Sequence, residues 1–578
     1  MAASGERPPP FTAGGTATRR HRSARLMNPI TPFLSATASG PGSELDDRNF
    51  VLPVGGLDNV ERLRALDTVD EYLSHRRKYL VGYQATQDMQ GTALDLARFM
   101  PNNINNLGDP FKSGGYKPNT KVLERAVLDY YARLWRAKRP HDPADPESYW
   151  AYMLSMGSTE GNMYALWNAR EYLSGKALIQ SLTAPPRYVQ ATPDRQNPHA
   201  HRPVAFYSED THYSFAKAVR VLGVESFHVV GREEYPDQCP LSHPLTGQRE
   251  WPAEVPSRPG PSGHSWDGPG EIDIDALAVL VEFFASNGHP IFINLNLGST
   301  FKGAHDDVRK VCERLLPIFE RHDLIRREVI YGTDPNTGEE LVDLRRGFWI
   351  HVDGALGAGY APFMRMASQE PTVYGWAPKT HLPEFDFGLT LLTSKFGALD
   401  MISSIAMSGH KWPGAPWPCG IYMTKVKYQI SPPSQPDYIG TPDTTFAGSR
   451  NGFSPLLLWD HLSRHSYQDQ VDRIRSAQEL ASYLEQRLRL MEQELGVELW
   501  PARTPGAVTV RFRKPSPELV AKWSLSSQDV LTDPGNESTR RSYVHVFVMP
   551  SVDRAKLDTL LAELAEDPAI LALATGGR

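Results

Sequence analysis

The chain has 578 residues, of which 40% are hydrophobic and 22% are charged, and its net charge is −6. This composition predicts a soluble protein of more than one domain with a sizeable core, and no apolar run approaches the roughly 20 residues of a membrane-spanning helix. Charges of both signs are interspersed along the chain, so there is no electrostatic case for binding nucleic acid or an anionic membrane.

The three cysteines, Cys239, Cys312 and Cys419, are scattered along the chain without paired spacing. This argues against a disulfide framework and against a structural zinc site, predicts no metal centre, and fits a reducing, cytoplasmic location. Residues 1–46 are rich in Pro, Ala, Gly, Ser, Thr and Arg and poor in acids. We expect a disordered, dispensable bacterial extension there rather than a transit peptide, since no amphipathic pattern is present.

The first periodic segment covers residues 57–80, where apolar residues recur at helical spacing (Leu63, Leu66, Val69 and Leu73). It predicts an amphipathic helix that serves either as a dimer arm or as a surface helix. An Asn-rich stretch with Gly and Pro follows at residues 99–111, and it predicts a loop close to the substrate. Residues 119–138 read as another helix.

Residues 149–156 predict a buried strand that runs into the small polar turn 157–162 and a helix over 163–173. Free backbone N–H groups at the start of a helix bind phosphate, although Ser and Thr are also ordinary helix caps. A second strand, residues 204–207, leads to His212 at a predicted helix start. This histidine could cap the helix, or its flat ring could stack on an aromatic cofactor.

Three segments, residues 233–271, 328–346 and 371–400, read as insertions, the second of them as a hairpin. Between them, strand 290–295 ends in the polar turn 296–300, and strand 348–352 ends in Asp353, which is followed by Gly354 and Ala355. Ligand sites of open α/β sheets lie at the carboxyl ends of the strands. A carboxylate buried there needs a cationic partner, which a protonated pyridine nitrogen supplies.

The strand that begins at Ser404 ends in Ser408, Gly409, His410 and Lys411. A partly desolvated lysine forms a Schiff base with an aldehyde, and a nearby serine hydroxyl can bond a phosphate. Pyridoxal phosphate (PLP) carries both groups. Beyond the lysine we expect a strand at 419–424, helices at 454–465 and 467–495, and a compact α/β appendage at the end of the chain.

The ordered set of phosphate turn, histidine, polar turn, aspartate and lysine resembles the group II PLP-dependent amino-acid decarboxylases, in particular the histidine and serine decarboxylase branch. The matching stretches are residues 105–111, 157–162, 211–214, 302–307, 350–355, 408–411, 418–420, 448–452 and 544–550. The resemblance covers residues 57 to 567, with interruptions at the insertions.

The resemblance implies the α/β fold of type I PLP enzymes, with a large, mostly parallel, seven-stranded sheet domain and a small C-terminal α/β domain. We expect an N-terminal arm and substrate-side loop at 47–118, the PLP domain at 119–430, the catalytic loop, linking helices and small domain at 431–567, and a tail at 568–578. It also implies a homodimer with shared active sites.

The resemblance further assigns roles to individual positions. Lys411 forms the Schiff base, Asp353 pairs with the pyridine nitrogen, His212 stacks on the ring, and Ala355 lies against its other face. Tyr438 matches the loop tyrosine that returns a proton to the substrate. The expected phosphate and ring-edge contacts are Ser158, Thr159, Ser408, His410 and Thr300, and the expected substrate contacts are Asn105, Asn106 and Ser449.

The expected reaction is α-decarboxylation of an L-amino acid to CO2 and an amine. Residues 84–90 and the region near 101–103 depart from the histidine and serine branch, and Met89, Leu94, Phe99 and Met100 suggest an apolar pocket, although core packing explains them equally well. We therefore expect valine, leucine or methionine as substrate. The alternatives are histidine or serine, a decarboxylation-coupled oxidative deaminase, which the presence of Tyr438 disfavours, and a non-catalytic PLP-binding protein.

Overall fold

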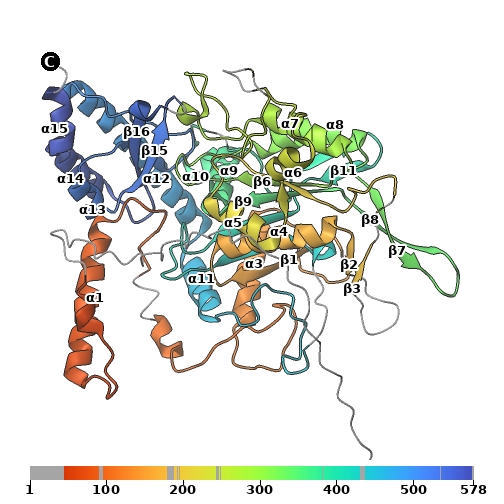
Figure 1. Ribbon diagram of the computed structural model, residues 1–578. Helices are drawn as coiled ribbons and strands as arrows, with labels where there is room; N and C mark the ends of the chain where they lie inside the picture. Colours follow the sequence, from red (N-terminus) through yellow and green to blue (C-terminus); the bar gives the residue numbers. More distant parts are fainter. Residues whose placement is uncertain are drawn as a thin grey trace, which may run out of the picture. The chain divides into compact units, whose positions relative to one another are not determined.

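The computed structural model describes residues 45–89, 95–178, 188–191, 193, 195–242, 247, 249–380, 382–429, 436–533 and 536–575 (Figure 1). The chain divides into two units, residues 1–72 and 73–578. Nearly all of the extension expected at 1–46 lies outside the described residues, and so does Leu94. None of the helices in the described part combines the length and the hydropathy needed to cross a membrane.

The first unit contains a short 3₁₀ helix, η1 (Asp47–Phe50), and most of helix α1 (Asn59–Tyr79). Helix α1 agrees with the helix expected at 57–80. Its leucines Leu63 and Leu66 are exposed.

A seven-stranded sheet with the strand order β1-β13-β12-β9-β6-β4-β5 forms the centre of the second unit. All neighbouring strands pair in parallel except β13, which is antiparallel to both β1 and β12. The large, mostly parallel sheet expected from the sequence is therefore confirmed. Its strands are β1 (Tyr149–Leu154), β4 (Val204–Phe206), β5 (Glu225–Ser226), β6 (Ile291–Asn296), β9 (Phe348–Asp353), β12 (Ser404–Ser408) and β13 (Gly420–Lys425).

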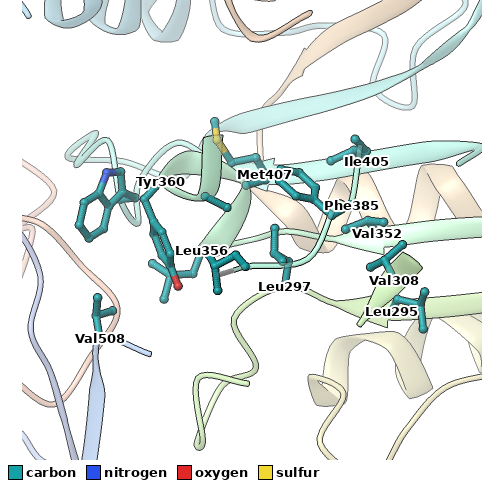
Figure 2. Packing of buried hydrophobic residues seen from close by; sticks show 14 of the residues in the cluster. Leu295, Leu297, Val308, Val352, Leu356, Tyr360, Phe385, Ile405, Met407 and Val508 are labelled. Carbon is teal, nitrogen blue, oxygen red and sulfur yellow. The ribbon is translucent and has the colours of Figure 1, made fainter. Parts of the chain in front are cut away.

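Both faces of this sheet are covered, which explains why its strands read as continuous apolar runs. Figure 2 shows Leu295, Val352 and Ile405, from three adjacent strands, packed with Val308 of helix α8. Alternate residues point to the opposite face, where Phe292 belongs to a separate cluster. Burial on two faces leaves only the strand ends open for polar chemistry.

The remaining elements of the second unit comprise helices, three hairpin-like pairs of strands and a small C-terminal sheet of order β14-β16-β15. The helices are α3 (Lys121–Leu134), α4 (Ser158–Leu173), α5 (Tyr213–Leu222), α6 (Phe227–Glu234), α7 (Ile274–Ser286), α8 (Val308–Arg321), α9 (Ala361–Gln369), α10 (Pro371–Tyr374), α11 (Phe453–Arg464), α12 (Tyr467–Leu495), α13 (Pro517–Lys522), α14 (Arg554–Ala565) and α15 (Pro568–Thr575). The other strands are β2 (Lys176–Leu178), β3 (Tyr188–Gln190), β7 (Arg327–Thr333), β8 (Glu340–Arg345), β10 (Thr390–Thr393), β11 (Gly397–Asp400), β14 (Thr509–Arg513), β15 (Ser526–Leu531) and β16 (Arg540–Phe547). Short 3₁₀ turns are η2 (Ala97–Phe99), η3 (Ser265–Asp267), η4 (Gly357–Gly359), η5 (Val426–Tyr428) and η6 (Glu537–Thr539).

Several elements differ from the pattern in the sequence. Helix α4 begins at Ser158 rather than at residue 163, because the turn is made by Gly157 alone, at φ 69°. The segment 233–271, read as a surface insertion, buries Cys239, Trp251 and Val255 in the core. Strand β15 and helix α15 were not expected, since the first is largely polar and the second lies in the segment taken as a tail.

Candidate active site

A cavity of about 180 Å³ lies where the carboxyl ends of β6, β9 and β12 meet the start of α4. It gathers all nine residues predicted to bind the cofactor, namely Ser158, Thr159, His212, Thr300, Asp353, Ala355, Ser408, His410 and Lys411. It is also lined by six that were not individually predicted: Met156, Asn162, Ser214, Asn296, Gly298 and Ser299. Asn162 and Asn296 stood inside the predicted polar turns, but nothing in the sequence said which turn residues point inward.

Lys411 follows β12 by a short turn, which brings its side chain into the cavity. Desolvation there lowers the pKa of the Lys411 ammonium, and the negative charge of Asp353 opposes this only in part. A lowered pKa increases the fraction of the neutral amine at neutral pH. Because only the neutral amine attacks an aldehyde, the cavity makes Lys411 a competent nucleophile.

Asp353 is held by two donors at the end of β9. The Asn162 Nδ2 amide donates to Oδ2 at 2.7 Å, and the backbone N–H of Ala355 donates to Oδ1 at 3.1 Å. Two hydrogen bonds leave acceptor capacity on the carboxylate, which can face a protonated ring nitrogen. The geometry fits a carboxylate that serves as a fixed anion inside the cavity.

A chain of buried hydrogen bonds continues behind Asn162. Its Oδ1 lies 3.0 Å from Nε2 of His351, whose Nδ1 lies 2.8 Å from Oγ of Ser404. Because the Asn162 NH2 group must face the carboxylate, its oxygen faces His351, and Nε2 therefore carries the proton. Burial lowers the pKa of His351 to about 4, so this ring is neutral at neutral pH.

His212 caps helix α5, and its ring faces the cavity. Its Nδ1 accepts from the backbone N–H of Ser214 at 3.3 Å, with the Ser214 hydroxyl 2.7 Å away. The ring proton is therefore on Nε2. Burial, together with the nearby Lys411, lowers the pKa of His212, so a neutral, flat imidazole lies beside the ring site.

The start of α4 is built for an anion. The Ser158 backbone N–H donates to Ser408 Oγ at 3.0 Å, and the two serine hydroxyls lie 3.1 Å apart. The positive end of the helix dipole and the unpaired N–H groups of a first turn favour phosphate. A Cβ on Gly157 would lie 2.5 Å from Cε1 of His410, so only glycine leaves this space open. Hydroxyls, lysine, aspartate and imidazole together fit pyridoxal phosphate.

The residues expected to contact substrate lie outside this cavity. Asn105 donates to Ser449 Oγ at 3.1 Å and accepts from the Arg450 N–H at 3.0 Å, which joins the two substrate-side loops. Asn106 is fully buried and binds Glu124 and the N–H of Thr120, each at 2.8 Å. Tyr438 is 83% exposed, and none of these residues lines the chain's own cavity.

No protein-family model matches the chain. The histidine decarboxylase of Mesorhizobium japonicum is 27% identical over 502 residues, which cover 87% of this chain and 97% of that protein. The histidine decarboxylase of Vibrio campbellii is 28% identical over 508 residues, with 88% and 95% covered.

Among solved structures, L-methionine decarboxylase from Streptomyces sp. 590 in complex with L-methionine methyl ester is 80% identical, with a TM-score of 0.88. The match covers 92% of this chain and all of that one. A second structure of that enzyme is described as its internal aldimine form, the Schiff base between enzyme and cofactor. The glutamate decarboxylase of Lactobacillus brevis, 15% identical with a TM-score of 0.56, shows the same fold.

Pyridoxal phosphate is therefore the cofactor of this chain, and the predicted activity class is confirmed. High identity over an entire solved enzyme agrees with the lysine, aspartate and histidine gathered at one cavity. The chain belongs to the group II PLP-dependent amino-acid decarboxylases.

Proposed function

We propose that this decarboxylase acts on L-methionine and releases CO2 and 3-methylthiopropylamine. The observation that carries the proposal is the 80% identity to L-methionine decarboxylase over the whole of that enzyme. The structures of that relative hold L-methionine methyl ester or 3-methylthiopropylamine. Valine and leucine, whose branched side chains are also apolar but smaller, are the next candidates.

The segment that departs from the histidine and serine branch lies next to the lysine. The Thr86 backbone N–H donates to the Lys411 carbonyl at 3.2 Å, and its hydroxyl donates to that of Trp412 at 3.1 Å. Met89 and Trp417 line a second cavity of about 460 Å³, which shares His410 with the cofactor cavity. A largely apolar space that shares His410 with the cofactor cavity supports an apolar substrate side chain.

When bound, pyridoxal phosphate supplies an electron-accepting ring that stabilises the negative charge left at Cα as CO2 departs. The chain's residues prepare that site. Asp353 holds a proton on the ring nitrogen, Asn162 holds Asp353, and the first turn of α4 binds the phosphate. We propose that the Tyr438 hydroxyl returns a proton to Cα of the substrate.

We further propose that the enzyme is a cytoplasmic homodimer. Tyr438 and the joined loops of Asn105 and Ser449 do not reach the chain's own cavity, so a partner subunit's cavity is the site where they can act. The exposed leucines of α1 support an arm that a second subunit covers. Three free, buried cysteines support a reducing compartment.

The deciding experiment supplies the purified holoenzyme with each proteinogenic L-amino acid and quantifies CO2, amine, aldehyde and peroxide. We expect CO2 and stoichiometric amine from methionine, and no turnover by Lys411→Ala. Turnover of histidine or serine alone would contradict the substrate but not the chemistry. Aldehyde with peroxide would identify an oxidative deaminase, and a Tyr438→Phe variant that decarboxylates normally would remove Tyr438 from the reaction.

A further inference from the structure

A second cluster of ligating side chains lies at the amino ends of the parallel strands, opposite the edge that carries the cofactor cavity. His199 precedes β4, His289 precedes β6, and Glu234 is the last residue of α6. One ligand atom from each lies within 4.8 Å of the other two. None of the three takes part in the decarboxylation site.

His289 is prepared as a ligand. Its ring is fully buried, and Nδ1 lies 3.0 Å from the Arg202 carbonyl. A carbonyl only accepts, so Nδ1 carries the proton and Nε2 presents a lone pair. Nε2 has no hydrogen-bond partner among the described residues. An unpaired buried polar atom is costly, and a metal-binding histidine usually donates its other N–H to a carbonyl, as this ring does.

The other two ligands are positioned around that lone pair. The ring of His199 stacks on His289 with centroids 4.4 Å apart and planes at 29°. Oε1 of Glu234 accepts from the Arg202 guanidinium, which also pairs with Glu225 at 2.6 Å. Arg202 thus orients two ligands: its backbone carbonyl holds His289, and its guanidinium holds Glu234. Glu225 pairs with the same guanidinium and so partly neutralises its positive charge.

Two imidazole nitrogens and a carboxylate oxygen form a donor set that zinc favours, with a water molecule in the fourth position. Ligands at about 2.0–2.2 Å from a tetrahedral zinc ion lie about 3.4 Å apart. Glu234 is exposed and His199 is only partly buried, so both can rotate to close the set, and the ion can enter from solvent. The lack of cysteine pairs in the sequence does not bear on such a site, because its ligands come from three separate segments.

We propose that His199, Glu234 and His289 form a structural site for a divalent transition metal, with zinc preferred. The ion would tie the end of α6 and the turn before β4 to the start of β6, at the edge of the central sheet. Its role is separate from the chemistry at Lys411, so it does not rest on the proposed substrate.

The test strips the holoenzyme with a chelator and titrates Zn²⁺ by calorimetry. We expect a specific site that raises the thermal midpoint, while activity without added metal is retained. His199→Ala and Glu234→Gln should each weaken Zn²⁺ binding at least 10-fold. His322→Ala is the matched control, because His322 lies 2.7 Å from Glu282, which also binds Arg321, and belongs to no three-ligand cluster among the described residues, so its loss should leave binding unchanged.

Anomalous diffraction from zinc-soaked crystals locates the ion independently of folding effects. A peak between the three side chains supports the proposal. Equal Zn²⁺ binding by the wild type and by a His199→Ala, Glu234→Gln double variant, or a peak only elsewhere, would overturn it.

Discussion

The side-chain amide of Asn162 and the backbone N–H of Ala355 orient the carboxylate of Asp353, which we propose pairs with the ring nitrogen of the cofactor. Asn162 joins Asp353 to the neutral ring of His351, and Ser404 anchors that ring while accepting from the Trp349 indole at 2.9 Å. Every member of this chain is buried, so removal of one leaves its neighbours unpaired. We therefore expect His351 and Ser404 to influence the reaction, although neither lines the cavity.

Asn162→Ala should lower kcat/KM about 10- to 100-fold, because a hydrogen bond to a charged group contributes about 1.5–3 kcal/mol. The measurement is steady-state decarboxylation with saturating cofactor. Asn168→Ala is the matched control, since Asn168 lies on the same helix, is equally buried, and bonds Tyr428 and Tyr422 instead. Equal losses in both variants would mean that Asn162 acts only through stability.

At the scale of elements, the junction of β1 and α4 creates the site that we propose for the cofactor phosphate. Gly157 adopts φ 69° there, and its hydrogen faces His410. A strand that turned less sharply would aim the first N–H groups of the helix away from the cavity.

Gly157→Ala should weaken cofactor binding at least about 10-fold, because the added methyl group would lie 2.5 Å from His410 and 3.3 Å from Ser408 Oγ. Gly223→Ala controls for backbone strain, since Gly223 also has a positive φ, 62°, and no atom within 4 Å of its Cβ position. Fluorescence titration of the apoenzyme with PLP measures both. Similar affinities would refute a steric role for this junction.

Helix α12 packs on both α9 and α14, and so connects two parts of the second unit. Ser466 begins it with a reciprocal cap in which its side chain and that of Asp469 bond each other's backbone. Ser466→Ala should therefore cost about 1 kcal/mol of stability without changing kcat. Ser463→Ala, which removes only an exposed bond to the Asp460 carbonyl, should cost less in the same denaturant titration.

At the scale of the whole molecule, burial of neutral histidines couples stability to pH. Burial lowers the pKa of His305, His351 and His545 to about 4, and that of His461 to about 3. In the unfolded chain each histidine has a pKa near 6.5. Between pH 6.5 and the lowered pKa values, the unfolded chain therefore binds more protons than the folded one. Stability contributed by these rings is complete above pH 6.5 and declines as pH falls toward 4.

We expect the thermal midpoint to fall as pH is lowered from 6.5 to 4.5. Each histidine should reduce the free energy of unfolding by up to about 1.4 kcal/mol per pH unit. Asp306 acts in the opposite sense, because burial raises its pKa to about 7. Burial also raises the pKa of four other carboxyls, Glu160, Glu254, Glu271 and Asp400, and lowers that of five further histidines, His141, His201, His212, His289 and His410. His545→Gln, in the small domain, should flatten the profile. A midpoint that does not change over this range, or an unchanged slope in the variant, would contradict the argument.

The sequence by itself determined the local chemistry of the site. Asp353 is the last residue of an apolar strand, and Lys411 and His212 follow such strands closely, so covalent connection alone brings all three to one edge of the sheet. The same locality holds for the small residues at the start of α4. These features depend on neighbours in the chain, which a sequence displays directly.

Only the tertiary structure decided which distant residues meet. The strand order, the contact of Asn162 with Asp353, the closing of loop 105–111 against residue 449, and the meeting of His199, Glu234 and His289 all join segments far apart in sequence. Likewise, Asn106 was expected at the substrate but lies in a buried network with Glu124. Such contacts arise from how the helices and strands pack, and no local pattern of residues encodes that packing.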